Sequence, residues 1–270
     1  RGLNVEADVI EKRGTVSIMN RCHGFWSLGI MTGSLFGAGF LAFQTSPFVA
    51  IGLLSLVLVP ISVMVCRALP VHEAPVTEAQ PRSSWRRPSP GILGISLFVF
   101  GITMTEGAVA DWSAVYLKDV FATSGMATGM GYVVFALMVS VGRFVGDGAK
   151  ERFGSVMLAR VCLVFALSGM VLVVMAPVTP LVYLGLACVG LGVSVGFPLA
   201  VTAAADLGDR PAAENVAILS FIALLGFLVG PPMIGFVAEV LDLRSGLATL
   251  LPALLLSILL AGLLRPRRGA

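Results

Sequence analysis

Charged side chains are scarce in this sequence of 270 residues: Asp, Glu, Lys and Arg together make up 12% of it. A soluble domain carries about 25%. Hydrophobic residues make up 57%, and the mean hydropathy is +0.96. A soluble core built from such a chain would leave long apolar faces in water. These figures therefore exclude a soluble domain and indicate a polytopic membrane protein.

Features of several other protein classes are also missing. The net charge is only +3, too small for a nucleic-acid-binding protein, and the sequence holds only two histidines. The four cysteines lie in or beside apolar runs, and none forms a Cys-x-x-Cys pair, so no zinc site or redox motif is predicted. No metal or cofactor is expected. These cysteines are Cys22, Cys66, Cys162 and Cys188.

Eight apolar segments are long enough to cross a hydrocarbon layer of ~30 Å as helices. The segment 67–90 between the second and the third is polar, with five prolines and four arginines, and is typical of a linker. We therefore expect an all-α membrane protein divided into residues 1–66, a linker 67–90 and a six-helix half 91–270. The eight segments are 22–43, 47–66, 91–117, 126–146, 156–176, 180–204, 215–238 and 245–264.

Basic residues indicate how the helices are oriented. When the connections are assigned to alternate sides, 16 of the 18 Lys and Arg residues fall on one side, and only Lys118 and Arg244 fall on the other. Because cytoplasmic loops carry an excess of Lys and Arg, both ends of this chain and its linker are expected to be cytoplasmic.

A glycine pattern repeats at an offset of 193 residues, which equals six helices with their loops. Its first copy is Gly33-x-x-x-Gly37 and its second is Gly226-x-x-x-Gly230; such pairs let helices approach closely in lipid. Internal repeats of this kind are typical of transporters. By this count four helices of the first half are missing at the N-terminal side. The residues expected to pack closely are Gly29, Gly33, Gly37, Gly226, Gly230, Pro231, Pro232 and Gly235.

A second glycine run, Gly190-Leu191-Gly192 with Gly196, superficially resembles a dinucleotide-binding loop. No alternating strand–helix pattern surrounds it, so close helix packing with a kink at Pro198 is the preferred interpretation.

Several short strings resemble the major facilitator superfamily. Gly142-Arg143-Phe144-Val145-Gly146-Asp147, followed by Arg152-Phe153-Gly154, is similar to that family's loop signature between helices eight and nine. The strings 23–29 (HGFWSLG) and 110–117 (ADWSAVYL) are similar to the MosC-like branch of bacterial inner-membrane permeases. The resemblance implies helices five to twelve of a twelve-helix fold, and a secondary transporter that moves a small solute across the lipid bilayer by alternating access.

Glu106 is the acidic residue placed deepest in a span. At 1.5 Å per residue from Ile92 it lies ~21 Å into the helix, a little past the middle of the membrane. A carboxylate there must be paired, hydrated or protonated, so it is expected to face a cavity and to couple solute movement to protons. The alternative is a protonated Glu106 that only ties helices together. Thr103 falls on the same helical face.

Two further titratable residues are weaker candidates for the solute or proton site. Asp111 lies nearer the outer end and on another face, either in an outer gate or simply hydrated. His23 begins the first helix at the cytoplasmic boundary, where a structural role is the alternative.

The signature residues suggest a gate at the cytoplasmic end of the segment 126–146. Asp147 is expected near the N-terminus of the 22–43 helix, whose partial positive charge favours a carboxylate. The alternative is a loop of ordinary cytoplasmic charges. The proposed gating residues are Gly142, Arg143, Gly146, Asp147 and Arg152.

Two other functions stay open: a non-transporting receptor or scaffold on the same fold, and an integral-membrane enzyme. The enzyme is disfavoured because no cluster of Asp, Glu and His lies at a membrane face.

Overall fold

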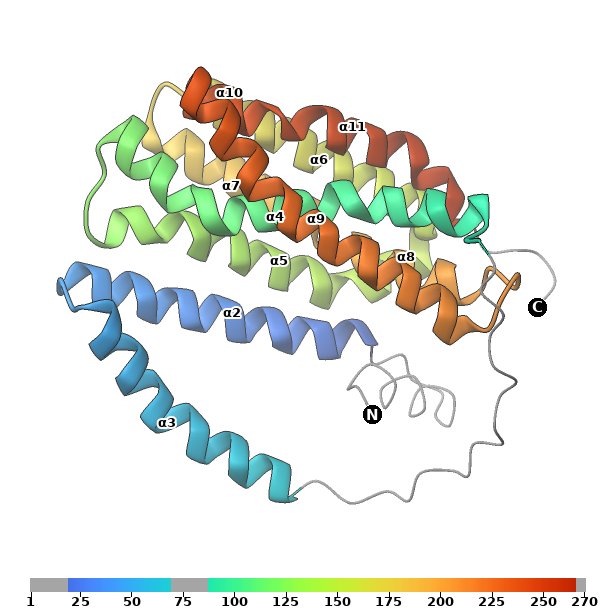
Figure 1. Ribbon diagram of the computed structural model, residues 1–270, viewed down its shortest axis with the longest axis horizontal. Helices are drawn as coiled ribbons and strands as arrows, with labels where there is room; N and C mark the ends of the chain where they lie inside the picture. Colours follow the sequence, from blue (N-terminus) through green and yellow to red (C-terminus); the bar gives the residue numbers. More distant parts are fainter. Residues whose placement is uncertain (1–18, 69–86, 266–270) are drawn as a thin grey trace.

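The computed structural model describes residues 19–68 and 87–265, with backbone only for residues 19–23. Within these ranges the chain is helical and has no strand (Figure 1). Eight of its helical spans are long and apolar enough to cross a membrane. The expected all-α membrane fold is therefore confirmed.

The helices follow the predicted segments closely, with three differences. The segment 245–264 is divided into three short helical pieces. The segment predicted to end at residue 146 continues as one helix to Phe153, and the segment 180–204 is broken at Ser194–Val195. The helices are α2 (Met19–Ala42), α3 (Pro47–Ala68), α4 (Pro90–Phe121), α5 (Met126–Phe153), α6 (Ser155–Met175), α7 (Thr179–Val193), α8 (Gly196–Ala205), α9 (Ala212–Val240), α10 (Leu243–Ala248) and α11 (Leu250–Leu260), followed by a 3-10 turn η1 (Ala261–Leu264).

Helix α4 is the central element of the bundle (Figure 1). It begins at the N-cap Ser89, whose hydroxyl accepts a hydrogen bond from the Ile92 N–H at 3.3 Å, with Pro90 at the first helical position. Small residues let neighbouring helices come close to it: a Cβ on Gly226 of α9 would lie 2.8 Å from the Phe100 carbonyl oxygen. Such contacts replace the hydrophobic effect, which lipid does not supply between helices.

Helix α2 lies along α5, whereas α3 diverges from the bundle (Figure 1). Near one end of α2 the ring of Phe144 covers Gly24, where an added Cβ would lie 3.0 Å from the ring, and near the other end Ala38 packs on Gly129. No residue of α3 is buried. Residues 69–86, most of the predicted linker, lie outside the described part, so the domain division stays a prediction.

The two glycine repeats behave differently in the described part of the chain. Gly226 and Gly230 press on the α4 backbone, and a Cβ on Gly235 would lie 3.3 Å from the Trp112 ring. In contrast, Cβ atoms on Gly29, Gly33 and Gly37 would meet nothing within 4 Å. The close packing predicted for this stripe stays a prediction, because no described helix covers that face of α2.

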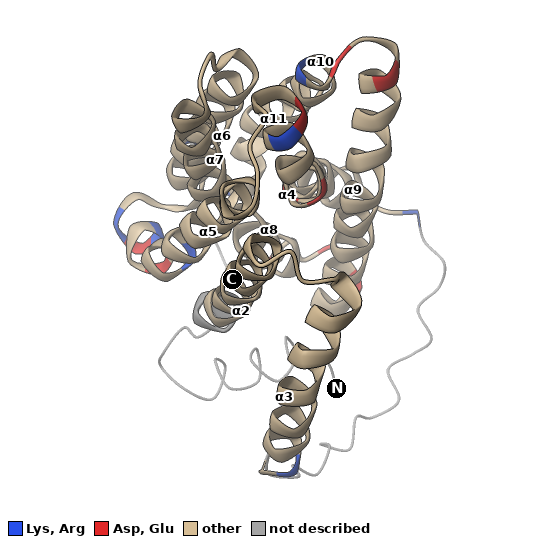
Figure 2. Cartoon of the chain, turned by 90° about the vertical axis from the view of Figure 1, so that its left-hand side faces the viewer, with Lys and Arg blue, Asp and Glu red and all other residues tan. Residues whose placement is uncertain are grey.

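Charged residues are sparse along the helices (Figure 2). Arg143 is one of the basic residues that the sequence assigns to the cytoplasmic side. It lies within α5 and is only 8% exposed, because it packs inside the bundle and not in a connection. Its burial removes it from the topology signal and makes it a candidate for function.

Candidate solute and coupling site

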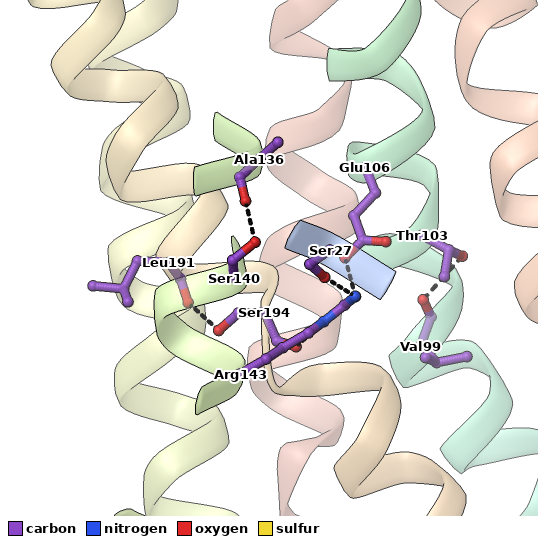
Figure 3. Close-up of polar contacts among 9 residues, drawn as sticks. All are labelled: Ser27, Val99, Thr103, Glu106, Ala136, Ser140, Arg143, Leu191 and Ser194. Carbon is purple, nitrogen blue, oxygen red and sulfur yellow. Dashed lines mark hydrogen bonds and ion pairs between the residues drawn. The ribbon is translucent and has the colours of Figure 1, made fainter. Parts of the chain in front are cut away.

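A cavity of about 110 Å³ lies where α2, α4, α5 and α9 meet. Its polar end is formed by Ser27, Glu106 and Arg143, which lie together in Figure 3. The rest of its wall is apolar or aromatic, so polar groups of a bound molecule would be directed to this one end. The remaining lining residues are Trp26, Ile30, Ala110, Tyr132, Phe135, Ala136, Val139 and Phe227.

Glu106 and Arg143 form an ion pair across the cavity end, with Oε1 of Glu106 3.5 Å from an Arg143 guanidinium nitrogen (Figure 3). Their side chains are 14% and 9% exposed. Opposite charges compensate one another where water is largely excluded, which allows both to reside within the membrane span. Among the described residues, Oε1 is buried and has no hydrogen-bond donor, so the ion pair with Arg143 is its main compensation.

Arg143 also contacts two other elements. One guanidinium nitrogen donates a hydrogen bond to the Ser27 hydroxyl of α2, and Nε donates to the Ser194 carbonyl at 3.2 Å. The planar guanidinium holds its donors in a fixed fork, so one side chain can meet three partners in different directions. The cavity end is therefore held by contacts from α2, α4, α5 and the α7–α8 connection.

Thr103 does not line this cavity, contrary to the expectation that it shares the face of Glu106. Its hydroxyl donates to the carbonyls of Val99 and Phe100, each at 3.2 Å, and lies against Gly226 of α9. A three-residue step along a helix turns the side chain by about 60° short of a full turn, which is enough to move Thr103 to the α4–α9 contact.

Asp111 does not join the ion pair in the described part of the chain. Asp111 is exposed beside a shallow pocket formed with Trp112, Pro231 and Pro232. The Trp112 indole donates to the Pro231 carbonyl at 3.0 Å and so joins α4 to α9. The His23 side chain lies outside the described residues.

The predicted gating residues separate into two groups. Gly142, Arg143 and Gly146 face the α7–α8 connection inside the bundle, since a Cβ on Gly146 would lie 2.8 Å from a Val195 methyl group. Asp147 instead lines an open cavity of about 570 Å³ near the end of α5. The exposed Arg152 lies on the last turn of that helix. The contact of Asp147 with residues 19–24 stays a prediction, because most of those side chains are outside the described part.

Metal binding finds no support in residues 19–68 and 87–265, which hold no group of three or more His, Cys, Asp or Glu residues able to share an ion.

Eight helices able to span a membrane, with a charged pair at an internal cavity, make the described part of the chain a polytopic membrane protein. The family model described as the Major Facilitator Superfamily matches residues 7–218. The chain therefore belongs to the major facilitator superfamily.

Similar proteins support this assignment. An uncharacterized transporter of Sinorhizobium fredii is 30% identical over 90% of this chain and 64% of its own length. An uncharacterized MFS-type transporter of Yersinia pestis is 27% identical over 89% of the chain and 62% of its own length. The membrane protein MosC of Rhizobium meliloti is 31% identical over 91% of the chain and 59% of its own length, which confirms the predicted resemblance.

The chain thus spans about three fifths of the length of the curated relatives it matches. No solved structure matches it.

Proposed function

We propose that this chain is part of a secondary transporter that moves a small solute across a bacterial inner membrane by alternating access, coupled to protons. The observation that carries the proposal is the Glu106–Arg143 pair, 3.5 Å apart at the polar end of a cavity between membrane-spanning helices. Two relatives are described as transporters, which supports the same activity class.

Glu106 is the proposed proton-coupling group. When Glu106 is ionised its carboxylate pairs with Arg143, and proton uptake would cancel this attraction. The guanidinium stays charged throughout, so Arg143 would then be free to change partner within the site. Alternate protonation of one carboxylate could in this way open and close the contact between α2 and the other helices.

The exposed face of α2 indicates what else the transporter needs. Gly29, Gly33 and Gly37 form a stripe that no described helix covers. We propose that this stripe packs against further membrane helices of the same protein, four in the family arrangement. The cavity described above would then be one side of a larger solute site.

Uptake into proteoliposomes, made with the protein expressed from its full coding sequence, tests this function. We expect accumulation of a solute found by screening, driven by an imposed proton gradient. Glu106→Gln should abolish gradient-driven uptake and leave membrane insertion intact, because the amide cannot exchange a proton. Gradient-driven uptake that is unchanged in Glu106→Gln would reject Glu106 as the coupling group. A protein that binds a solute without moving it would instead be a receptor.

Membrane-impermeant maleimide tests the proposed orientation in whole cells. With the native cysteines replaced, Ser124→Cys should react from outside and Glu151→Cys only after the cells are opened. The opposite pattern would place both ends of the chain outside.

A further inference from the structure

The span from Thr179 to Ala205 is interrupted at Ser194 and Val195, between α7 and α8. Pro198 lies four residues after Ser194 and has no backbone N–H. In a continuous helix that N–H would donate to the Ser194 carbonyl, so this carbonyl is left without its helical partner. Inside a bilayer no water is available to replace the donor, so the protein must provide one.

Arg143 provides that donor from the neighbouring helix α5. Its Nε donates to the Ser194 carbonyl at 3.2 Å, and the side chain is almost completely buried. The hydroxyl of Ser194 is satisfied separately, since it donates to the Leu191 carbonyl at 2.7 Å (Figure 3).

The two glycines that flank Arg143 allow this contact. A Cβ on Gly142 would overlap the Ser194 side chain, and one on Gly146 would lie 2.8 Å from Val195. Ser194 and Val195, where the span is interrupted, therefore both lie directly against glycines of α5. The sequence Gly142-Arg143-x-x-Gly146 is thus shaped to receive the break between α7 and α8.

We propose that Arg143 is a positioning residue that replaces the hydrogen bond lost at Pro198 and so links the α7–α8 break to Glu106 and to Ser27 of α2. The same guanidinium reaches all three partners. A change of charge or of ligand at Glu106 therefore shifts the Arg143 side chain, whose Nε is bonded to the Ser194 carbonyl at the break. The relevance of this link to solute movement rests on the proposed function, whereas the positioning of the break does not.

Two substitutions separate this role from a general need for positive charge. Arg143→Lys keeps the charge, but an ammonium group is a single point at the end of a flexible chain and cannot reproduce the Nε contact while it pairs with Glu106. Pro198→Ala restores a backbone N–H opposite the Ser194 carbonyl, so the break no longer needs Arg143.

Pulsed EPR distances across the break test the proposal without measuring transport. Spin labels at Val178→Cys and Asp206→Cys, in the full-length protein without native cysteines, would lie about 40 Å apart along the helix direction. We expect Arg143→Gln and Arg143→Lys to shift or broaden the distance distribution. Adding Pro198→Ala to either variant should return it toward a narrow distribution. An unchanged distribution in both arginine variants, or no response to Pro198→Ala, would overturn the proposal.

A matched proline provides the control. Pro60 also lies inside a membrane helix, in α3, away from Arg143. The loss of thermal stability caused by Arg143→Gln should be smaller in the Pro198→Ala background and unchanged in the Pro60→Ala background. Equal losses in all three backgrounds would contradict the assigned role. If Arg143→Gln does not fold, the same comparison is made with Arg143→Lys.

Proteoliposome uptake, measured on the same variants, distinguishes the two proposals. Distances that respond as expected in a protein that transports nothing would reject the proposed function and leave the positioning role intact. Gradient-driven uptake in a protein whose distances do not respond would reject the positioning role and leave the proposed function intact.

Discussion

At the scale of single residues, the Glu106–Arg143 pair gives the sharpest energetic prediction. Removing one partner of a buried ion pair costs roughly 3–5 kcal/mol, because the other charge is left uncompensated. We expect Glu106→Gln and Arg143→Gln each to destabilise the protein in detergent, and the double variant to lose less than the sum of the two.

Acid should separate the two single variants. In Arg143→Gln the remaining carboxylate can become neutral by taking up a proton, so the loss of stability should shrink as the pH falls. In Glu106→Gln the guanidinium stays charged at every accessible pH, so the loss relative to the parent protein should persist until acid protonates Glu106 of the parent itself. Thermal unfolding of the four proteins across a pH series measures both effects. Additive losses that are independent of pH would mean that the pair does not interact.

The same two residues show how far the sequence could predict the site. Glu106 could be found because an acidic residue in the middle of an apolar run is unusual. The sequence places Arg143 at the cytoplasmic end of the segment 126–146 and groups it with the charges that follow, because these charges resemble a loop. Helix α5 continues to Phe153, and the partner of Arg143 lies 37 positions away in the chain. Only the packing of α4 against α5 brings them together.

At the scale of elements, the α8–α9 connection is fastened to the start of α4. A hydrogen bond from the Ser89 hydroxyl is the largest cause that holds the pKa of Asp209 below its usual value. The Asn215 amide, which donates to Oδ1 of Asp209 at 2.7 Å, acts in the same direction. Arg210 in the same connection pairs with Glu214 at 3.8 Å and donates to the Arg87 carbonyl. These contacts favour the ionised form of Asp209 and link the α8–α9 connection to the start of α4.

A depressed pKa means that the contact is fully favourable above the unfolded-state value, about 3.9, and is lost as the pH falls through the lower folded-state value. Ser89→Ala removes the largest cause, so it should raise the pKa of Asp209 toward the unfolded value. Carbon-13 titration of labelled aspartate, assigned with Asp209→Asn, measures the shift in the full-length protein. Ser46→Ala, a distant serine before α3, serves as the control and should leave the titration unchanged. A pKa of Asp209 that is the same with and without Ser89 would refute the contact.

Helix boundaries can be predicted well where an element ends in turn chemistry and poorly where it ends by tertiary contact. Ser89-Pro90 is a local start signal, and α4 begins there. The break at Ser194–Val195 is different, since Pro198 indicates a kink but not its position or its partner. The donor that satisfies Ser194 comes from α5, and no pattern within residues 180–204 contains that information.

At the scale of the whole molecule, the two glycine repeats test whether further helices complete the structure. Gly226→Ala should cost about 1–3 kcal/mol, because the new methyl group would lie 2.8 Å from the Phe100 carbonyl oxygen and the α4 backbone cannot yield. In the protein made from its full coding sequence, Gly33→Ala should cost a comparable amount if another helix covers α2 as proposed. Gly52→Ala is the control: it lies on exposed α3 outside the stripe, with nothing within 4 Å of a Cβ. There the better helix propensity of alanine should make the change neutral or stabilising, by up to about 1 kcal/mol.

Thermal unfolding in detergent, with uptake measured in parallel, reads out all three variants. If Gly33→Ala behaves like Gly52→Ala, the α2 stripe meets lipid, and the proposal that more helices of the same protein pack there is wrong.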